Sequence, residues 1–280
     1  AALANGVWAA WLLGGGGTIL DTMFGPFRSH SPDRPLVVSV LLSLWYYVRC
    51  RVYWEPDAGR FSRLDWPKTM ALASAIATFG LGVVWGNPLA TGADASGYVS
   101  QAELWTSGTL TRPTPPWARD APWGDAAFTA APVGYRSGRE PDTIVPFYSA
   151  GFPLVMALFR LLGGRGAMFL AVPLLGALTV WLTYLLGRSL GGSWCGAIAG
   201  LLLLASPAFL ITLMTAMSDV PVTAWWTLAA YATLSATTGG AIVSGLAAAL
   251  AILTRPNTAP LAAVVTLLVL VEARQRISRG

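Results

Sequence analysis

The sequence predicts an all-α protein: a polytopic transmembrane helical bundle with a long outer-face loop that carries short interfacial helices. Three observations lead to this fold class. Of the 280 residues, 55% are hydrophobic and only 11% are charged, whereas soluble domains carry about 25% charged residues. The mean hydropathy is +0.58. Several apolar segments have about the 20-residue length that a bilayer requires, and a polar, proline-rich insert separates them.

The charge and the metal-ligating residues exclude some function classes. The 18 Lys and Arg exceed the 13 Asp and Glu by 5, which in a membrane protein reports orientation and contacts with lipids. The basic residues form no stripe interleaved with aromatics, so we expect no nucleic-acid partner. His30 is the single histidine, which excludes a multi-histidine metal site, and we assign no metal ligands. Cys50 and Cys195 fall in or beside apolar segments and are interpreted as reduced and structural.

The first region, residues 1–68, is predicted to hold N-terminal apolar segments and a basic cytoplasmic linker. Residues 4–23 are apolar but interrupted by four glycines, which predicts a weak or broken membrane helix. No Lys-Ser/Thr follows these glycines, so they do not form a P-loop. Residues 35–54 are a better candidate for a membrane span, and the start of the chain lacks the basic residues of a signal peptide.

The second region, residues 69–272, is predicted to be the transmembrane domain, with an outer loop at 86–165. Residues 69–85 are just long enough to cross a bilayer. The loop is longer and richer in proline than a simple connection, which favours a functional role, and Ser96–Gly108 is predicted to form a short helix in it. Residues 146–162 are apolar and contain a proline, so they form either an interfacial helix or a full span.

Further apolar segments follow this loop, and a basic cytoplasmic tail occupies 273–280. The segments are predicted at 167–187, 190–214, 220–236, 240–254 and 257–271. If 146–162 is interfacial, the main basic clusters lie on the cytoplasmic side, as the positive-inside rule requires. We prefer that topology. It predicts a multi-pass protein of the cell (inner, cytoplasmic) membrane with its active site on the outer face.

Three charged residues then fall on the outer face: Asp94, Asp219 and Arg255. A carboxylate can act as a general base, and an arginine fork matches a phosphate. Each residue also has a structural interpretation. Asp94 lies in a turn-forming sequence, Asp219 resembles a helix N-cap followed by proline, and Arg255 could be an interfacial anchor between two helices.

The order of motifs resembles the membrane glycosyltransferases of the GT-C class. It is most similar to the branch that includes the aminoarabinose transferase of lipid A modification and the protein O-mannosyltransferases. The resemblance covers roughly residues 70–272. The residues that carry it are Asp94 with Tyr98, the stretch Tyr148–Pro153, Ser218-Asp219-Val220-Pro221 and Arg255-Pro256-Asn257.

The resemblance implies a transferase that takes a sugar from a polyprenyl-phosphate carrier at the outer face. Asp94 and Asp219 would be the catalytic carboxylates, and Arg255 with Tyr98 would bind the donor phosphate. Glu103 and Tyr148 would position the acceptor or the loop; Glu103 could also be the solvated face of a surface helix. No cofactor is assigned, and a divalent cation stays open. Ala95 stands where many relatives carry a second acid, which argues against a paired-carboxylate mechanism or a metal at that point.

Two departures from the family pattern limit what the resemblance implies. The lysine that aminoarabinose enzymes carry ahead of Pro153 is absent, which argues against lipid A as the acceptor. The class usually has more helices, so the chain is also interpretable as the catalytic part of a longer enzyme. The alternatives to an enzyme are a transporter or flippase subunit that handles lipid-linked glycans and a non-catalytic module that assists a partner. The sequence leaves the sugar, the acceptor and the oligomeric state open.

Overall fold

The computed structural model describes residues 18–22, 25–29, 65–119, 126–129, 131–235 and 237–277. The chain forms two compact units, residues 1–59 and 60–280. In the first unit, β1 (Thr18–Thr22) pairs antiparallel with β2 (Gly25–Ser29). The helix predicted at 4–23 is therefore wrong where it overlaps β1, whose threonines and isoleucine favour a strand. The span predicted at 35–54 lies outside the described residues.

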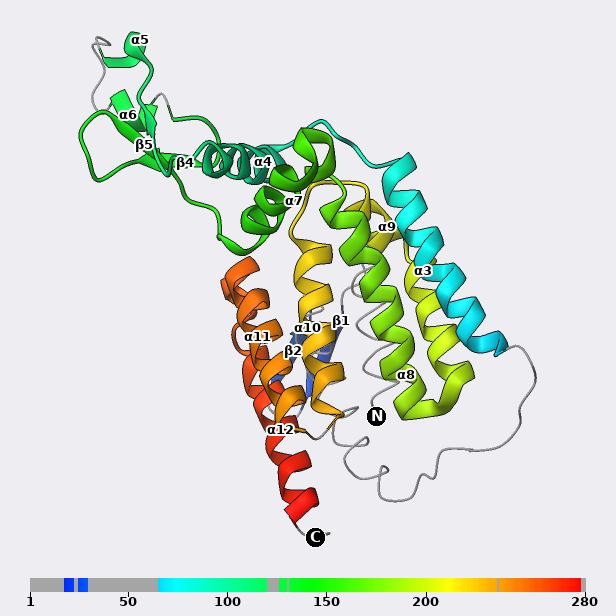
Figure 1. Ribbon diagram of the computed structural model, residues 1–280. Helices are drawn as coiled ribbons and strands as arrows, with labels where there is room; N and C mark the ends of the chain where they lie inside the picture. Colours follow the sequence, from blue (N-terminus) through cyan, green and yellow to red (C-terminus); the bar gives the residue numbers. More distant parts are fainter. Residues whose placement is uncertain are drawn as a thin grey trace. The chain divides into compact units, whose positions relative to one another are not determined.

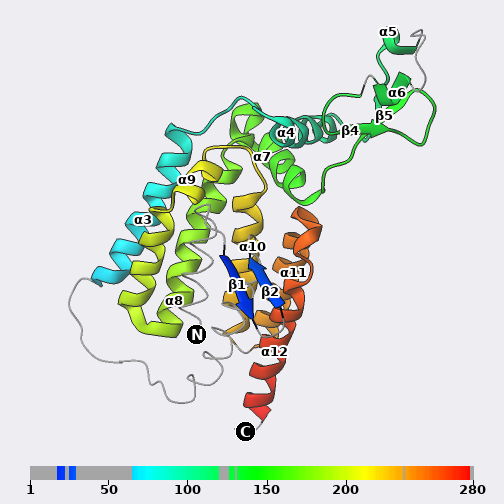
Figure 2. The ribbon, with the colours of Figure 1, turned by 180° about the vertical axis from the view of Figure 1, so that it is seen from behind.

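The second unit is mainly helical, as predicted. Figure 1 shows long helices side by side, with α4 and α7 at one end of the bundle. Figure 2 shows the same arrangement from behind. The helices are α3 (Trp66–Val84), α4 (Ala93–Thr106), α7 (Gly151–Met168), α8 (Ala171–Leu204), α9 (Pro207–Leu213), α10 (Asp219–Thr233), α11 (Thr238–Thr254) and α12 (Leu261–Ile277). A short 3-10 helix, η2 (Pro256–Thr258), follows α11.

Helix α3 packs closely on α8 because its buried face is made of small residues. That face consists of Pro67, Ala71, Ser74, Ala75, Thr78 and Gly82. Small side chains let two helix backbones approach, which is how membrane helices commonly pack. At Gly82 a Cβ atom would lie 2.9 Å from Pro173 of α8. Trp66 and Trp85, at the two ends of α3, are each 62% exposed, which is typical of aromatic residues at the two membrane interfaces.

Helix α8 is a hairpin of two antiparallel arms. The backbone reverses at Gly192, whose φ of +83° suits a glycine. Next to the turn the two arms of α8 are in close contact, because a Cβ atom at Gly196 would collide with the Tyr184 carbonyl. The sequence predicted this reversal between 167–187 and 190–214. The second predicted segment is wrong in its length, because Ser206-Pro207 ends the arm at Leu204 and begins α9.

Among the described residues, α3 and α8 are the helices long and apolar enough to cross a membrane. Shorter apolar helices are Thr238–Thr254 and Leu261–Val271. Helix α7 is not among them, and it breaks at Gly163 and Gly164, which have non-helical backbone angles. This break favours the interfacial interpretation of residues 146–162.

The polar insert contains strands that the all-α prediction missed. It carries β3 (Arg112–Pro113), α5 (Pro116–Arg119), α6 (Ala126–Thr129), β4 (Tyr135–Ser137) and β5 (Thr143–Pro146). The strands form an antiparallel sheet in the order β3-β5-β4. Tyr135 and Ile144 of this sheet are buried with Leu104 of α4, so α4 provides the core of the insert. In Figure 1 the insert extends away from the end of the bundle.

Candidate functional site

Helix α4 carries Asp94 in its first turn. Gly92 precedes the helix with a φ of +88°, a conformation that glycine adopts without strain. The positive end of the helix dipole favours a carboxylate in the first turn. Asp94 is half-buried, and its Oδ1 accepts a hydrogen bond of 2.7 Å from the Tyr148 hydroxyl. The residue is therefore part of a helix, and the interpretation as a turn former is wrong.

Tyr148 lies over two glycines. A Cβ atom at Gly97 of α4, or at Gly134 of the insert, would collide with its ring, and the Phe147 ring stacks on it at 4.8 Å. Burial raises the pKa of Tyr148 to about 12, together with its hydrogen bond to Asp94 and the negative charge there. Tyr148 therefore stays protonated at neutral pH and serves as a hydrogen-bond donor to Asp94.

Tyr98 lies one helical turn after Asp94 and connects α4 to α10. Its ring centroid is 4.9 Å from that of Tyr148 and 5.3 Å from that of Phe152. Its hydroxyl oxygen is 3.1 Å from the Ser218 Oγ, and both groups are buried. The sequence predicted that Tyr98 binds the donor phosphate. In the structure its hydroxyl lies within hydrogen-bond distance of the Ser218 hydroxyl.

Arg255 lies at the end of α11, where Pro256 stops the helix. Its Nε donates to the Ser218 Oγ at 2.9 Å, and its Nη2 donates to the Asp219 Oδ2 at 3.0 Å. The Arg255 and Asp219 side chains are 33% and 34% exposed, so both are accessible. Its Nη1 has no hydrogen-bond partner within the described part of the chain.

The predicted N-cap role of Asp219 is wrong. Ser218 occupies the N-cap position of α10, its side chain makes no capping hydrogen bond, and Asp219 is the first helical residue. Its carboxylate accepts from Arg255, and Arg255 is accordingly an ion-pair partner as well as the residue between two helices.

These contacts form one continuous network that joins helices α4, α10 and α11 with the segment between β5 and α7. Its order is Asp94, Tyr148, Tyr98, Ser218, Arg255 and Asp219. The sequence nominated all of these except Ser218. Ser218 belongs to the Ser-Asp motif, but it was not assigned to the site because its side chain is uncharged.

Glu103 is not part of this network. It lies more than two turns further along α4, and its Oε1 accepts hydrogen bonds from Arg160 at 3.1 Å and from Arg165 at 2.9 Å. Both arginines belong to α7, one on each side of the break at Gly163 and Gly164. The interpretation of Glu103 as a solvated helix face is therefore wrong.

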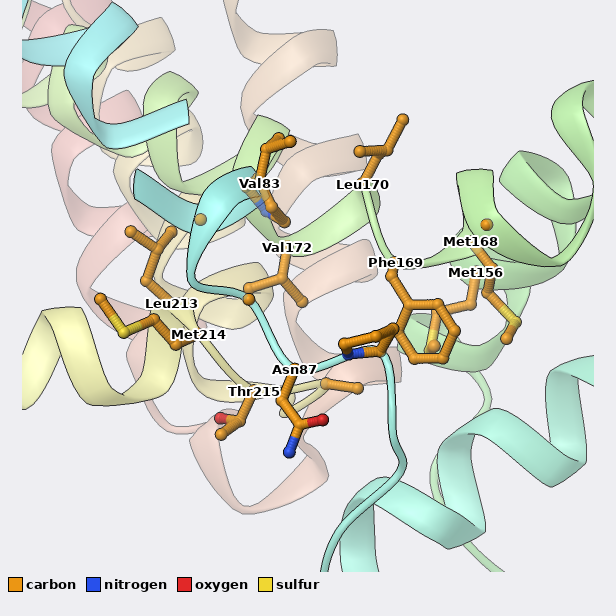
Figure 3. A pocket seen from close by; sticks show the side chains of 16 residues that line it. Val83, Asn87, Met156, Met168, Phe169, Leu170, Val172, Leu213, Met214 and Thr215 are labelled. Atoms are coloured by element: carbon orange, nitrogen blue, oxygen red, sulfur yellow. The ribbon is translucent and has the colours of Figure 1, made fainter. Parts of the chain in front are cut away.

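A pocket of about 160 Å³ opens between the ends of α3, α7, α8 and α9. Figure 3 shows Met156, Met168 and Phe169 on one side of it and Leu213 and Met214 on the other. Its lining is predominantly apolar. Its lining residue Met156 belongs to the same hydrophobic cluster as Tyr98, and its lining residue Ala216 lies two positions before Ser218.

Among the described residues, no group of three or more His, Cys, Asp or Glu side chains could hold a metal ion. Cys195 is a free, exposed thiol at the α8 turn, whereas Cys50 and His30 lie outside the described residues.

Comparison with known proteins supports the predicted resemblance. Residues 146–279 match the model of a family described as dolichyl-phosphate-mannose-protein mannosyltransferase. Neither the curated proteins nor the solved structures gave a significant match. The matched segment contains Tyr148, Ser218, Asp219 and Arg255, and it begins after Asp94. The family it matches is one of GT-C-type membrane glycosyltransferases, and the match covers a little under half of the chain.

Proposed function

We propose that this GT-C-like membrane protein transfers a sugar from a polyprenyl-phosphate donor to an acceptor at the outer face of the membrane, with inversion of the anomeric centre. One observation carries the proposal. Asp94 and Arg255 are 161 positions apart by their numbers, yet one network of hydrogen bonds and ring contacts connects them. The network links the residue that we propose as the base to the residue that we propose as the phosphate-binding group, which supports assigning both to one site.

Asp94 is proposed as the general base. Its Oδ1 is occupied by the Tyr148 hydroxyl, and its Oδ2 has no hydrogen-bond partner among the described residues. A carboxylate with one oxygen fixed and the other available can remove the proton from an acceptor hydroxyl as that oxygen attacks the sugar. A positioned general base contributes roughly 10²–10⁴-fold to the rate.

Arg255 is proposed to bind the phosphate of the donor. Ser218 and Asp219 hold its guanidinium in place through Nε and Nη2, which leaves Nη1 for a phosphate oxygen. The sugar–phosphate bond breaks with its electron pair going to the phosphate, so a fixed positive charge there stabilises the leaving group. Asp219 orients Arg255 in this scheme and is not itself the base.

The apolar pocket is proposed to receive the part of the carrier chain nearest the phosphate. Isoprenoid units are apolar, and the methionines and Phe169 of the pocket present a matching surface. Methionine side chains adapt to irregular apolar ligands. A donor that arrives through the bilayer needs no nucleotide-binding domain, which fits a chain made largely of apolar helices.

The decisive experiment measures sugar transfer from a polyprenyl-phosphate donor in reconstituted vesicles. Asp94→Asn keeps an acceptor for the Tyr148 hydroxyl and removes the base, so transfer should fall by about a hundredfold or more. Asp142→Asn is the matched control, because this exposed aspartate lies in the turn before β5. Transfer that persists in Asp94→Asn would remove Asp94 from the mechanism. No transfer by the wild type with any tested sugar would favour a non-catalytic module.

The outer-face assignment is testable separately with a membrane-impermeant maleimide. Cys195 lies at the α8 turn, at the end of the bundle opposite α4 in Figure 1, and Glu140 is exposed in the insert. In oriented cells, a Glu140→Cys variant with Cys50 and Cys195 changed to serine should be labelled from outside. A Cys50→Ser variant that retains Cys195 should be protected. The reverse pattern would place the site on the cytoplasmic side.

A further inference from the structure

Helix α7 carries exposed leucines on its outward face and two arginines near its C-terminal end. Nothing in the proposed transfer reaction uses either group. Leu154, Leu158, Leu161 and Leu162 are 52%, 55%, 70% and 78% exposed. The positions 154, 158 and 161 follow the spacing of one helical face. The opposite face, with Phe152 and Met156, is buried in the bundle.

The two arginines lie near the C-terminal end of α7. Arg160 continues the spacing of Phe152 and Met156, on the side of the helix that meets α4, and Arg165 follows the break at Gly163 and Gly164. Arg160 and Arg165 both donate to a single oxygen of Glu103, the Oε1. Two guanidiniums against one carboxylate leave a net charge of +1. In each arginine the other guanidinium nitrogens have no hydrogen-bond partner among the described residues, so donors are left for an anion.

The backbone beside the arginines is open. All residues from Leu161 to Gly166 are exposed, and a Cβ atom at Gly164 or Gly166 would meet no atom of the described chain within 4 Å. The break at Gly163 and Gly164 thus leaves room next to Arg165 that a head group could fill.

We propose that this surface, formed by the four leucines and the Arg160–Arg165 pair, binds anionic phospholipid. The leucines would lie among the acyl chains, and the arginines would bind the phosphate of the head group. An apolar face bordered by cations is the arrangement with which interfacial helices bind anionic membranes. A zwitterionic lipid supplies the same phosphate with a compensating cation, so the +1 cluster favours an anionic one. This binding does not depend on the proposed sugar transfer.

The experiment uses the full chain purified in detergent and titrated with phosphatidylglycerol, phosphatidylcholine or inorganic phosphate. The readout is the melting temperature, from which an apparent affinity is obtained. Phosphatidylglycerol should raise the melting temperature at lower concentrations than phosphatidylcholine does. In Arg160→Gln/Arg165→Gln the apparent affinity for phosphatidylglycerol should fall about fivefold for each arginine removed. Arg188→Gln is the control, an exposed arginine beside the α8 turn.

Two further results separate lipid binding from a purely structural ion pair. Glu103→Gln frees both arginines, so it should keep or strengthen the preference for phosphatidylglycerol. If the cluster served only to hold α7 on α4, Glu103→Gln and the double arginine variant would lose stability alike and neither would alter lipid preference. Equal effects of the two lipids, an equal effect of inorganic phosphate, or an equal loss in Arg188→Gln would overturn the proposal.

The leucine face is tested by the depth of a fluorescent label. A bimane on Leu161→Cys, with Cys50 and Cys195 replaced by serine, should be quenched by lipids brominated on their acyl chains. The same label on Glu140→Cys, in the exposed insert, should be quenched far less. Equal quenching at the two positions would show that the α7 face does not enter the bilayer.

Discussion

The fully buried hydroxyl of Ser218 accepts a hydrogen bond of 2.9 Å from the Nε of Arg255 and lies 3.1 Å from the hydroxyl of Tyr98. It is the single atom through which the α4 half of the network meets the Arg255–Asp219 pair. A small uncharged residue therefore determines the geometry of the charged ones.

Ser218→Ala should weaken donor binding. The change leaves Arg255 held by Asp219 alone and leaves the buried Tyr98 hydroxyl without its partner. A hydrogen bond to a charged group contributes about 1.5–3 kcal/mol, so the KM for the lipid-linked donor should rise by about tenfold or more, with a smaller change in kcat. Steady-state kinetics with varied donor measures this.

The control for Ser218→Ala is Ser100→Ala. Among the described residues, the Ser100 hydroxyl bonds only to the Gly97 carbonyl on α4. The donor KM of this control should match that of the wild type. An unchanged KM in Ser218→Ala would show that Asp219 alone positions Arg255.

Tyr148 should make the fold sensitive to alkali. Its pKa is raised to about 12 by burial and by Asp94, against about 10 in an unfolded chain. The folded state therefore holds a proton that the unfolded state has released between these values. This contribution to stability is complete below pH 10 and is lost as the pH rises toward 12.

Difference titration of phenolate absorbance checks this prediction. The wild type minus Tyr148→Phe should show one tyrosine ionising near pH 12, and the melting temperature of Tyr148→Phe should fall less steeply above pH 10. A difference signal centred at pH 10 would contradict the hydrogen bond to Asp94.

Much of the helical fold was predictable because membrane helices can be recognised in a sequence by their length and apolar composition. Helices α3, α10 and α11 lie within a few residues of the predicted 69–85, 220–236 and 240–254. The strands of the insert were not predictable in the same way. They have two to four residues each and lie among prolines, so no alternating pattern is long enough to read. Their core also depends on Leu104 of α4, which packs with Tyr135 and Ile144 of the sheet.

The candidate site was predictable in its charged residues and not in its connections. Asp94, Asp219 and Arg255 stand out because charges beside apolar segments are costly. The sequence did not indicate that Tyr148 bonds Asp94 or that Ser218 joins Tyr98 to Arg255, because these pairs depend on how α4 meets α7 and α10. Glu103 was selected because it is charged. Its position on α4 places its carboxylate against Arg160 and Arg165 instead of in the network.

Gly97→Ala should disrupt the contact between α4 and Tyr148. The added Cβ would collide with the Tyr148 ring, so the ring must move away from Asp94. Overpacking of this kind costs about 1–3 kcal/mol. The melting temperature should fall, and transfer activity should fall with it.

Gly80→Ala is the matched control for Gly97→Ala. It makes the same change inside α3, where no atom lies within 4 Å of the new Cβ. Helix propensity alone should then leave stability equal or raised, by up to about 1 kcal/mol. If the two variants behaved alike, packing of Gly97 against Tyr148 would not be the cause.

Arg255→Lys should show whether geometry or charge alone binds the donor phosphate. An ammonium keeps the positive charge but lacks the planar fork that lets Arg255 bond Ser218 and Asp219 at once. If the fork positions the charge, donor affinity should fall by about tenfold or more, the size of one hydrogen bond to a charged group. Arg136→Lys, an exposed arginine of β4, should leave it unchanged. If Arg255→Lys binds the donor with wild-type affinity at both low and high salt, then a positive charge without the planar fork is enough for donor binding. Ser218 and Asp219 would then stabilise the fold without positioning the phosphate-binding group.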